Sequence, residues 1–174
     1  HYPLRRQRQM CIRDSPTTGG IIFILNKINF HKNIKNKDII DIGCGSGILG
    51  IVMAKLWRRN IELIDIDFLA IKTSSYNGKI NFLHRNLNIK KGDGLNITQK
   101  QKYDLITINI LATPILKSAY LINKKLKYKG RVIISGILHS QIFMILNKLR
   151  SMGLVLEMQY NKNNWSTLLL KKGS

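Results

Sequence analysis

Residues 38–50, with the sequence DIIDIGCGSGILG, constrain the fold of this chain more than any other stretch. The apolar run that ends at Ile42 is typical of a short buried strand, and the glycines between Gly43 and Gly47 predict a tight turn. The apolar residues that follow recur at helical spacing. A strand, a glycine turn and a helix in this order bring backbone N–H groups and the positive end of the helix dipole close to a bound ligand.

The same turn fits the fingerprints of two cofactor classes. The spacing from Gly45 to Gly50 matches the dinucleotide motif GxGxxG, and the spacing from Asp41 onward matches the DxGxGxG turn of proteins that bind S-adenosyl-L-methionine (SAM). A dinucleotide carries a pyrophosphate, which the Asp41 carboxylate would repel, whereas SAM carries a sulfonium and an amino group, which it would attract. We therefore expect SAM as the cofactor, with Asp41, Gly43 and Gly45 in its site. A nicotinamide-dependent dehydrogenase is the disfavoured alternative.

Size and composition are those of one globular unit. The chain has 174 residues, of which 44% are hydrophobic. No apolar run is long enough to span a bilayer and no secretory signal is recognisable, so membrane contact is not expected. Cys11 and Cys44 are isolated, which predicts neither a disulfide framework nor a metal site and favours a cytoplasmic location.

The net charge of +20 leaves two interpretations open. A basic surface attracts RNA, and contact with ribosomal RNA is one expectation. The other is coding bias, because the chain has 20 lysines but only 9 arginines and also uses isoleucine and asparagine heavily, as an AT-rich genome would produce. The basic run from Lys124 to Lys129 is expected to be a solvated helix end.

Helical and strand patterns alternate along the chain after residue 15. Residues 1–15 show neither period and look foreign to the protein, so the folded domain is expected to comprise residues 16–174. Alternating strands and helices indicate an α/β fold with a mostly parallel sheet, which the last two strands close with an antiparallel hairpin. Strands are predicted near 38–42, 61–67, 87–91, 103–108, 131–135, 154–160 and 165–170, and helices near 19–33, before 58, and near 68–79, 114–126 and 141–152.

Polar residues follow several of these strands, at their carboxyl ends. In a doubly wound sheet such ends converge on the rim where ligands bind, so we expect Asp65, Asp93 and Asn109 to lie near the glycine turn. An acid at the position of Asp65 can bind both ribose hydroxyls of a nucleoside, and Asp67 is expected to cap the next helix. Asp93 can accept a hydrogen bond from an adenine amino group. The alternatives are a solvated strand-end acid for Asp65 and a plain turn residue for Asp93.

Several short motifs occur in an order that resembles one family of methyltransferases. They are Pro16-Thr17-Thr18, DIGCGSGIL at 41–49, DID at 65–67, NILA at 109–112, SGIL at 135–138 and the late Trp165. Together they resemble the ribosomal protein methyltransferase family PrmA over residues 16 to about 172. The resemblance implies a class I SAM-dependent methyltransferase with a Rossmann-like, seven-stranded sheet. It also implies the reaction, N-methylation of lysine side chains and the N-terminal amine of the stalk-base protein of the large ribosomal subunit.

The resemblance assigns roles to individual residues. Thr18, Gly43, Asp65 and Asn109 would contact SAM, and Asn109 is the candidate catalytic residue. Its amide oxygen can orient the incoming amine but is too weak a base to take a proton, so the proton is expected to leave to solvent. The alternative for Asn109 is a turn residue that stabilises the strand end. Trp165 is expected in the core of the last strand and not in a ligand site.

The chain departs from the family at its beginning. The resemblance implies a glycine-rich segment and a histidine before Pro16, where this sequence has residues 1–15, and a separate N-terminal domain that docks the substrate. The chain is therefore expected to be the monomeric catalytic part of a larger protein. Methylation of RNA or of another protein remains an alternative function, as does a non-catalytic module that binds ribosomes or RNA.

Overall fold

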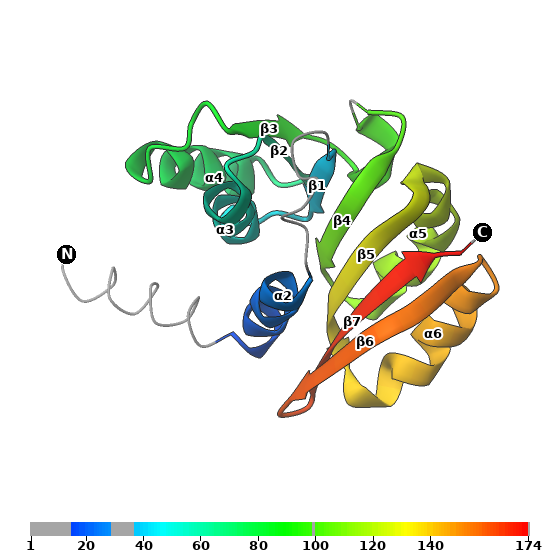
Figure 1. Cartoon of the computed structure of the whole chain (residues 1–174). Coiled ribbons are helices and arrows are strands. Elements are labelled where there is room, and N and C mark those ends of the chain that lie inside the picture. Colours follow the sequence, from blue (N-terminus) through cyan, green and yellow to red (C-terminus); the bar gives the residue numbers. More distant parts are fainter. Residues whose placement is uncertain (1–14, 29–36, 99, 174) are drawn as a thin grey trace.

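The computed structural model describes residues 15–28, 37–98 and 100–173 of the chain. Its strands form a seven-stranded sheet in the order β3-β2-β1-β4-β5-β7-β6 (Figure 1). β1 to β5 run parallel, and β7 pairs antiparallel with both β5 and β6. The strands are β1 (Ile39–Ile42), β2 (Ile61–Asp65), β3 (Leu87–Lys91), β4 (Tyr103–Asn109), β5 (Leu126–Leu138), β6 (Leu154–Lys162) and β7 (Trp165–Lys172). This architecture confirms the predicted Rossmann-like fold with its C-terminal hairpin.

Helices cover both faces of the sheet. The helices are α2 (Pro16–Lys27), α3 (Ile48–Trp57), α4 (Phe68–Ile80), α5 (Ala112–Lys125) and α6 (Ile142–Arg150), with short 3-10 turns η2 (Gly94–Ile97) and η3 (His139–Gln141). One hydrophobic core, which includes Ile115 and Ile145, lies under α5 and α6, and a second, which includes Ile21 and Leu49, lies under α2 and α3. Within the described residues, no helix has the length and apolar character needed to cross a membrane.

The strand order reverses between β1 and β4, so their carboxyl ends form a topological switch point, where open α/β sheets bind ligands. Cross-strand register brings candidate site residues level with one another at this end. Asp41 on β1 lies beside Thr107 on β4, and Asn109 on β4 lies beside Ser135 on β5. The predicted cap at the next rim position is also present, because the Asp67 side chain accepts from the backbone N–H of Leu69 at 2.9 Å.

Two predicted elements differ from the structure. The helix expected near 19–33 begins earlier, at Pro16, and ends at Lys27; residues 29–33, like most of the proposed foreign tail, lie outside the described residues. The run from Lys124 to Lys129 is not a solvated helix end, because α5 stops at Lys125 and β5 begins at Leu126. Leu126 is fully buried and pairs with Tyr103, and these long-range contacts override the local charge pattern.

Candidate functional site

The carboxyl ends of β1, β2, β3 and β4 surround a cavity of about 370 Å³, which we call the rim cavity. Its wall includes three of the predicted cofactor residues, Gly43, Asp65 and Asp93, together with Ile66 and Ile110. Asp93 precedes η2 and makes no side-chain capping bond to it, which leaves its carboxylate available at the cavity wall. The sheet topology therefore brings together residues that lie far apart in the sequence.

The glycine turn depends on the absence of side chains at two positions, for different reasons. Gly43 has φ +68° and its N–H donates to the carbonyl of Ile64 at 2.8 Å; a Cβ there would lie only 2.6 Å from Cγ2 of Ile110. Gly45 has φ +53°, but a Cβ there would meet nothing within 4 Å. The backbone at Gly45 thus borders open space, as close approach to a ligand requires.

Asp65 fastens the end of β2 to the glycine turn. Its Oδ2 accepts from the N–H of Gly45 at 2.8 Å, and its Oδ1 accepts from the N–H of Asp67 at 2.9 Å. A carboxylate oxygen has a second lone pair, so each oxygen can still accept one further hydrogen bond. These contacts hold the carboxylate at the cavity wall with acceptor capacity for two neighbouring hydroxyl groups.

Asp41 lies beneath the turn and outside the wall of the rim cavity. It is 1% exposed, and Thr107 donates to its Oδ1 at 2.6 Å, while Oδ2 has no hydrogen-bond partner among the described residues. Burial raises the pKa of the Asp41 carboxyl to about 7, the Thr107 hydrogen bond opposes this, and the negative charge of Asp65 adds to it. A buried carboxylate with a free oxygen is costly unless a donor or cation satisfies it, so ionisation of Asp41 is unfavourable in this structure.

Asn109 lines a second hollow of about 320 Å³, which we call the Asn109 pocket, whereas the predicted cofactor residue Thr18 is buried and is not among the residues of its wall. Nδ2 of Asn109 donates to Oγ1 of Thr18 at 3.5 Å. The start of α2 is held over the strand tips because the Ser135 hydroxyl donates to the carbonyl of Thr17 at 3.1 Å. Ile110 lines both this pocket and the rim cavity, so the two hollows adjoin at one side chain.

The family model described as "Ribosomal protein L11 methyltransferase (PrmA)" matches residues 14–173. The chain belongs to this family. The relative from Dictyoglomus turgidum, "Ribosomal protein L11 methyltransferase", is 37% identical over 157 residues, which are 88% of this chain and 49% of the relative. The relative of the same name from Oceanobacillus iheyensis is 32% identical, over 91% of this chain and 49% of its own length. The chain thus spans about half the length of these curated relatives.

Solved structures of methyltransferases share the fold. The "ribosomal protein L11 methylase" from Lactobacillus delbrueckii subsp. bulgaricus superposes with a TM-score of 0.79 at 24% identity, covering 90% of this chain and 80% of that one. An RNA methyltransferase from Salinibacter ruber, solved with S-adenosyl-L-homocysteine, has a TM-score of 0.71 at 16% identity and covers 91% and 94%. PrmA membership and the class I fold indicate SAM as the cofactor, as the sequence predicted, and give no support to a dehydrogenase.

Four features of this PrmA site escaped the sequence-based prediction. Ile110 separates the two hollows, although only its place in the NILA motif was noted. Gly136, predicted merely to end its strand, has φ +78° and no room for a Cβ, which would lie 2.5 Å from the Ile110 carbonyl oxygen. Trp165, expected in the core, is half-buried and lines the Asn109 pocket. The Thr107 partner of Asp41 had no signal in the sequence, because the two residues meet only through strand pairing.

Proposed function

We propose that this chain is the catalytic part of a SAM-dependent N-methyltransferase that modifies lysine side chains and the N-terminal amine of the ribosomal stalk-base protein. The names of its relatives support this substrate. The observation that carries the proposal is the junction of the two hollows at Ile110, with Asn109 on one side and Gly43 and Asp65 on the other. A cofactor and an amine bound on the two sides would meet at this side chain. The cytoplasmic location and the monomeric state expected from the sequence remain predictions.

The residues of the rim cavity fit the separate parts of SAM. The Asp65 carboxylate has acceptor capacity for the ribose hydroxyls, and Asp93 can accept from the adenine amino group. Asp41 is buried beneath the turn and is not on the cavity wall, so it would act on the cationic amino-acid end through its charge, while the turn at Gly43 and Gly45 admits a ligand against its backbone. When bound, SAM supplies a methyl group already activated on a sulfonium, so the protein has mainly to align the reactants and exclude water.

Asn109 is proposed to orient the amine that receives the methyl group. The hydrogen bond from its Nδ2 to Thr18 fixes the amide so that Oδ1 is left to accept from an amine N–H. An amide oxygen cannot take the proton from a lysine ammonium with a pKa of about 10.4, so the amine must lose that proton to solvent. The role of Asn109 is therefore positioning and not general-base catalysis.

The decisive experiment offers labelled SAM with the purified stalk-base ribosomal protein or with ribosomal RNA, and measures which one becomes labelled. We expect label in the protein, and loss of most of the turnover in Asn109→Ala. The exposed Asn147 on α6 provides a matched control, because Asn147→Ala removes the same amide far from both hollows. Wild-type turnover in Asn109→Ala would exclude the positioning role.

Two competing functions have distinct outcomes in the same assay. Label in RNA alone would indicate an RNA methyltransferase, and label in neither would favour a non-catalytic module. Calorimetry with SAM and with S-adenosyl-L-homocysteine distinguishes the RNA methyltransferase from the non-catalytic module. The methyltransferase would bind both compounds, whereas the non-catalytic module would bind neither. Asp65→Asn is expected to weaken both ligands, since both carry the ribose.

A further inference from the structure

Helix α4 packs on the sheet through small side chains and leaves its larger ones in solvent. Its buried residues are Ser74 and Gly78, and a Cβ at Gly78 would come within 3.0 Å of Leu87. The opposite side carries Phe68 (55% exposed), Tyr76 (58%) and Ile80 (48%). Residues spaced by four or eight positions share a helix face, so these apolar side chains form one stripe. We call this stripe, with the lysines between its members, the α4 face.

An unusual backbone conformation extends the α4 face at its carboxyl end. Phe82 follows the helix with φ +58° and is 89% exposed. The left-handed region is uncommon for a large non-glycine residue, and the exposed ring leaves apolar surface in water. The backbone cost is offset inside the fold, because Phe82 and Leu83 donate to the carbonyls of Lys79 and Gly78 at 3.0 and 2.8 Å and so cap α4. The exposure of the Phe82 ring is not offset in this way, and it extends the apolar stripe into solvent.

Cations lie among these aromatic side chains, and acids are missing. Between Asp67 and Asp93 the sequence contains no Asp or Glu, while it contains Lys72, Lys79, Arg85, Lys90 and Lys91. The Lys72 ammonium lies 4.6 Å from the centroid of the Phe68 ring, and that of Lys91 lies 5.9 Å from it. The acids at the two ends, Asp67 and Asp93, belong to the carboxyl rim and not to the α4 face.

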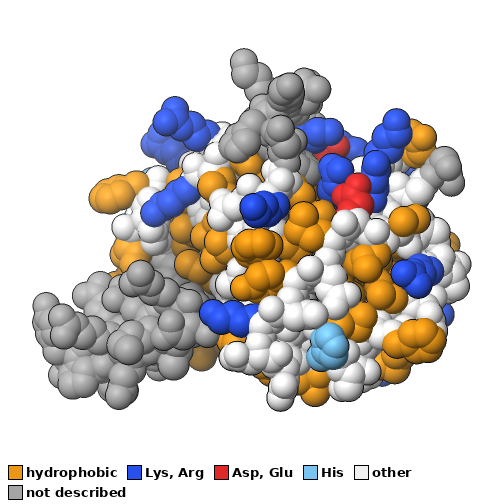
Figure 2. All heavy atoms as spheres, turned by 60° about the horizontal axis from the view of Figure 1, so that its bottom comes forward, with side chains coloured by type: hydrophobic (Ala, Val, Ile, Leu, Met, Phe, Trp, Pro, Cys, Tyr) orange, Lys and Arg blue, Asp and Glu red, His pale blue; other side chains and the backbone are white. Residues whose placement is uncertain are grey.

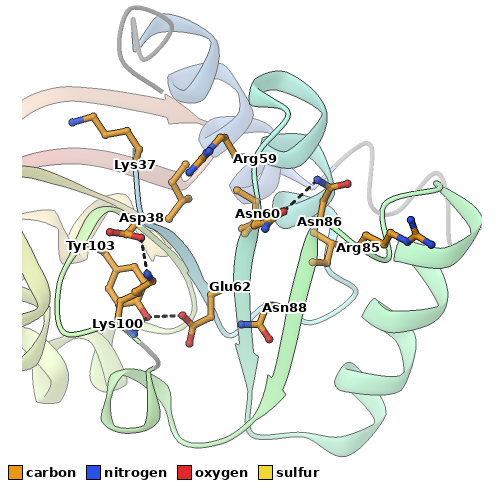
Figure 3. Close-up of a pocket in the computed structure, with 13 residues that line it drawn as sticks. Lys37, Asp38, Arg59, Asn60, Glu62, Arg85, Asn86, Asn88, Lys100 and Tyr103 are labelled. Carbon is orange, nitrogen blue, oxygen red and sulfur yellow. Dashed lines mark hydrogen bonds and ion pairs between the residues drawn. The ribbon is translucent and has the colours of Figure 1, made fainter. Parts of the chain in front are cut away.

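The residues that follow α4 in the sequence line a large cavity at the amino edge of the sheet. This amino-edge cavity, of about 530 Å³, is lined by Arg59 and Arg85 and by amides including Asn60, Asn86 and Asn88 (Figure 3). Neither arginine has an acidic partner among the described residues, and Nε of Arg59 is buried without a hydrogen-bond partner there. A phosphate group would satisfy these donors.

The Glu62 carboxylate, which is on the same cavity wall, does not cancel these cations. Tyr103 donates to its Oε2 at 2.6 Å. Burial, followed by the hydrogen bond to Glu62, raises the pKa of the Tyr103 hydroxyl above its ordinary value, so the hydroxyl remains a donor. Figure 3 shows Glu62 turned toward Tyr103 and Lys100, with Arg85 pointing away from this group.

Charge alone does not select this surface, because Lys and Arg side chains are spread across the molecule and acidic ones are sparse, as Figure 2 shows for one face. The distinguishing property is the alternation of exposed aromatic rings with cations. Unpaired nucleic acid uses both, since bases stack on rings and phosphates pair with Lys and Arg. An acidic protein would pair with the cations but has no regular series of flat bases to stack on rings that alternate with them. We propose that the α4 face, continued by Arg85 and Arg59 into the amino-edge cavity, binds unpaired RNA.

The first test compares two charge reversals of equal size. Lys72→Glu/Lys79→Glu alters the α4 face, and Lys117→Glu/Lys124→Glu makes the same change on the exposed side of α5. With a labelled twelve-nucleotide unpaired RNA and the full chain, the α4 variant should lose about tenfold or more in affinity. Its slope of log affinity against log salt should fall by about 1.4, the value for two phosphate contacts on a single strand. Equal losses in both variants would show unselective charge binding and overturn the proposal.

The second test leaves the charge unchanged. Phe68→Ala/Tyr76→Ala should weaken RNA binding by about tenfold at a salt concentration that screens the phosphate contacts, because stacking is less sensitive to salt. Tyr120→Ala on α5 is the control ring, and circular dichroism confirms that each variant is folded. Wild-type affinity in the α4 variant, or absence of RNA binding by the unaltered chain, would overturn the proposal. Both titrations omit SAM, so their result is independent of the proposed methyl transfer.

Discussion

At the carboxyl rim of the sheet, acidic side chains keep unused acceptor capacity, whereas at the amino edge Asp38 and Asp104 are paired with lysines. Asp41, on the rim side, has a buried oxygen without a partner among the described residues. At the amino edge, Lys127 lies 2.6 Å from Asp104 and 2.7 Å from Asp38, and Lys37 lies 3.0 Å from Asp104. The first arrangement leaves a buried acceptor unsatisfied, and the second fastens the starts of β1, β4 and β5 to one another.

Burial acts in the same direction at both sites, but the pKa values of Asp41 and Asp104 move in opposite directions because the two carboxylates differ in their hydrogen-bond donors. Burial raises the pKa of the Asp41 carboxyl to about 7 because a single hydroxyl hydrogen bond does not compensate for lost water. Burial also acts to raise the pKa of Asp104, but hydrogen bonds from Lys127, the N–H of Asp38 and Lys37 outweigh it and lower the pKa. The contrast indicates that an ionised Asp41 destabilises the fold, whereas an ionised Asp104 stabilises it.

The largest effect is expected for Asp41→Asn. A folded-state pKa raised from 3.8 to about 7 means that ionising Asp41 costs stability increasingly from pH 4 to pH 7. Asp41→Asn should therefore raise the free energy of unfolding at pH 8 by up to about 4 kcal/mol, with little gain at pH 4. Urea denaturation at both pH values measures this, and calorimetry should show weaker SAM binding.

Asp93→Asn is the control for that prediction, because it makes the same chemical change on an exposed rim residue. Its unfolding free energy should change by less than about 0.5 kcal/mol at either pH. If Asp41→Asn were neutral or destabilising at pH 8, the contrast between the two edges would lose its energetic basis.

An intermediate effect is expected at the glycine turn. Gly43→Ala should cost about 3 kcal/mol of unfolding free energy, since it adds a clash with Ile110 to an unfavourable φ, whereas Gly45→Ala should cost about 1 kcal/mol for φ alone. Thermal and urea unfolding measure both. Gly45→Ala should nevertheless weaken SAM binding, because its new methyl group would occupy the open space beside the turn. Equal stability losses would mean that the approach of Ile110 is not constraining.

The smallest effect is expected at the amino edge. Lys127→Met should lower the free energy of unfolding by roughly 1 kcal/mol at pH 7, since its side chain is 34% exposed and solvent screens the pairs. The pKa of Asp104 is lowered in the folded state, so this stabilisation is present above pH 4 and lost as the pH falls through the folded-state value. The variant and the wild type should therefore converge in acid. Lys171→Met, whose pair with Glu157 is longer at 3.7 Å, should cost less than about 0.5 kcal/mol.

Local patterns in the sequence were enough to predict most elements and the identity of the rim residues. The glycine turn, the cap at Asp67 and the acids after each strand are encoded within a few residues, because each depends on neighbouring backbone groups. Parallel strands place their carboxyl ends at one edge of a sheet, so Asp65, Asp93 and Asn109 could be assigned to one rim before their contacts were known. Their roles in binding remain predictions.

The sequence by itself determined the family, the fold class and which residues gather at the carboxyl rim. Tertiary structure decided which of them are satisfied, as the partnership of Asp41 with Thr107 and the place of Ile110 between two hollows show. It also placed Trp165 at a pocket and Leu126 in a strand, against the local pattern. The physical reason is that periodicity specifies only which face a residue occupies, whereas its partners depend on strand order and register.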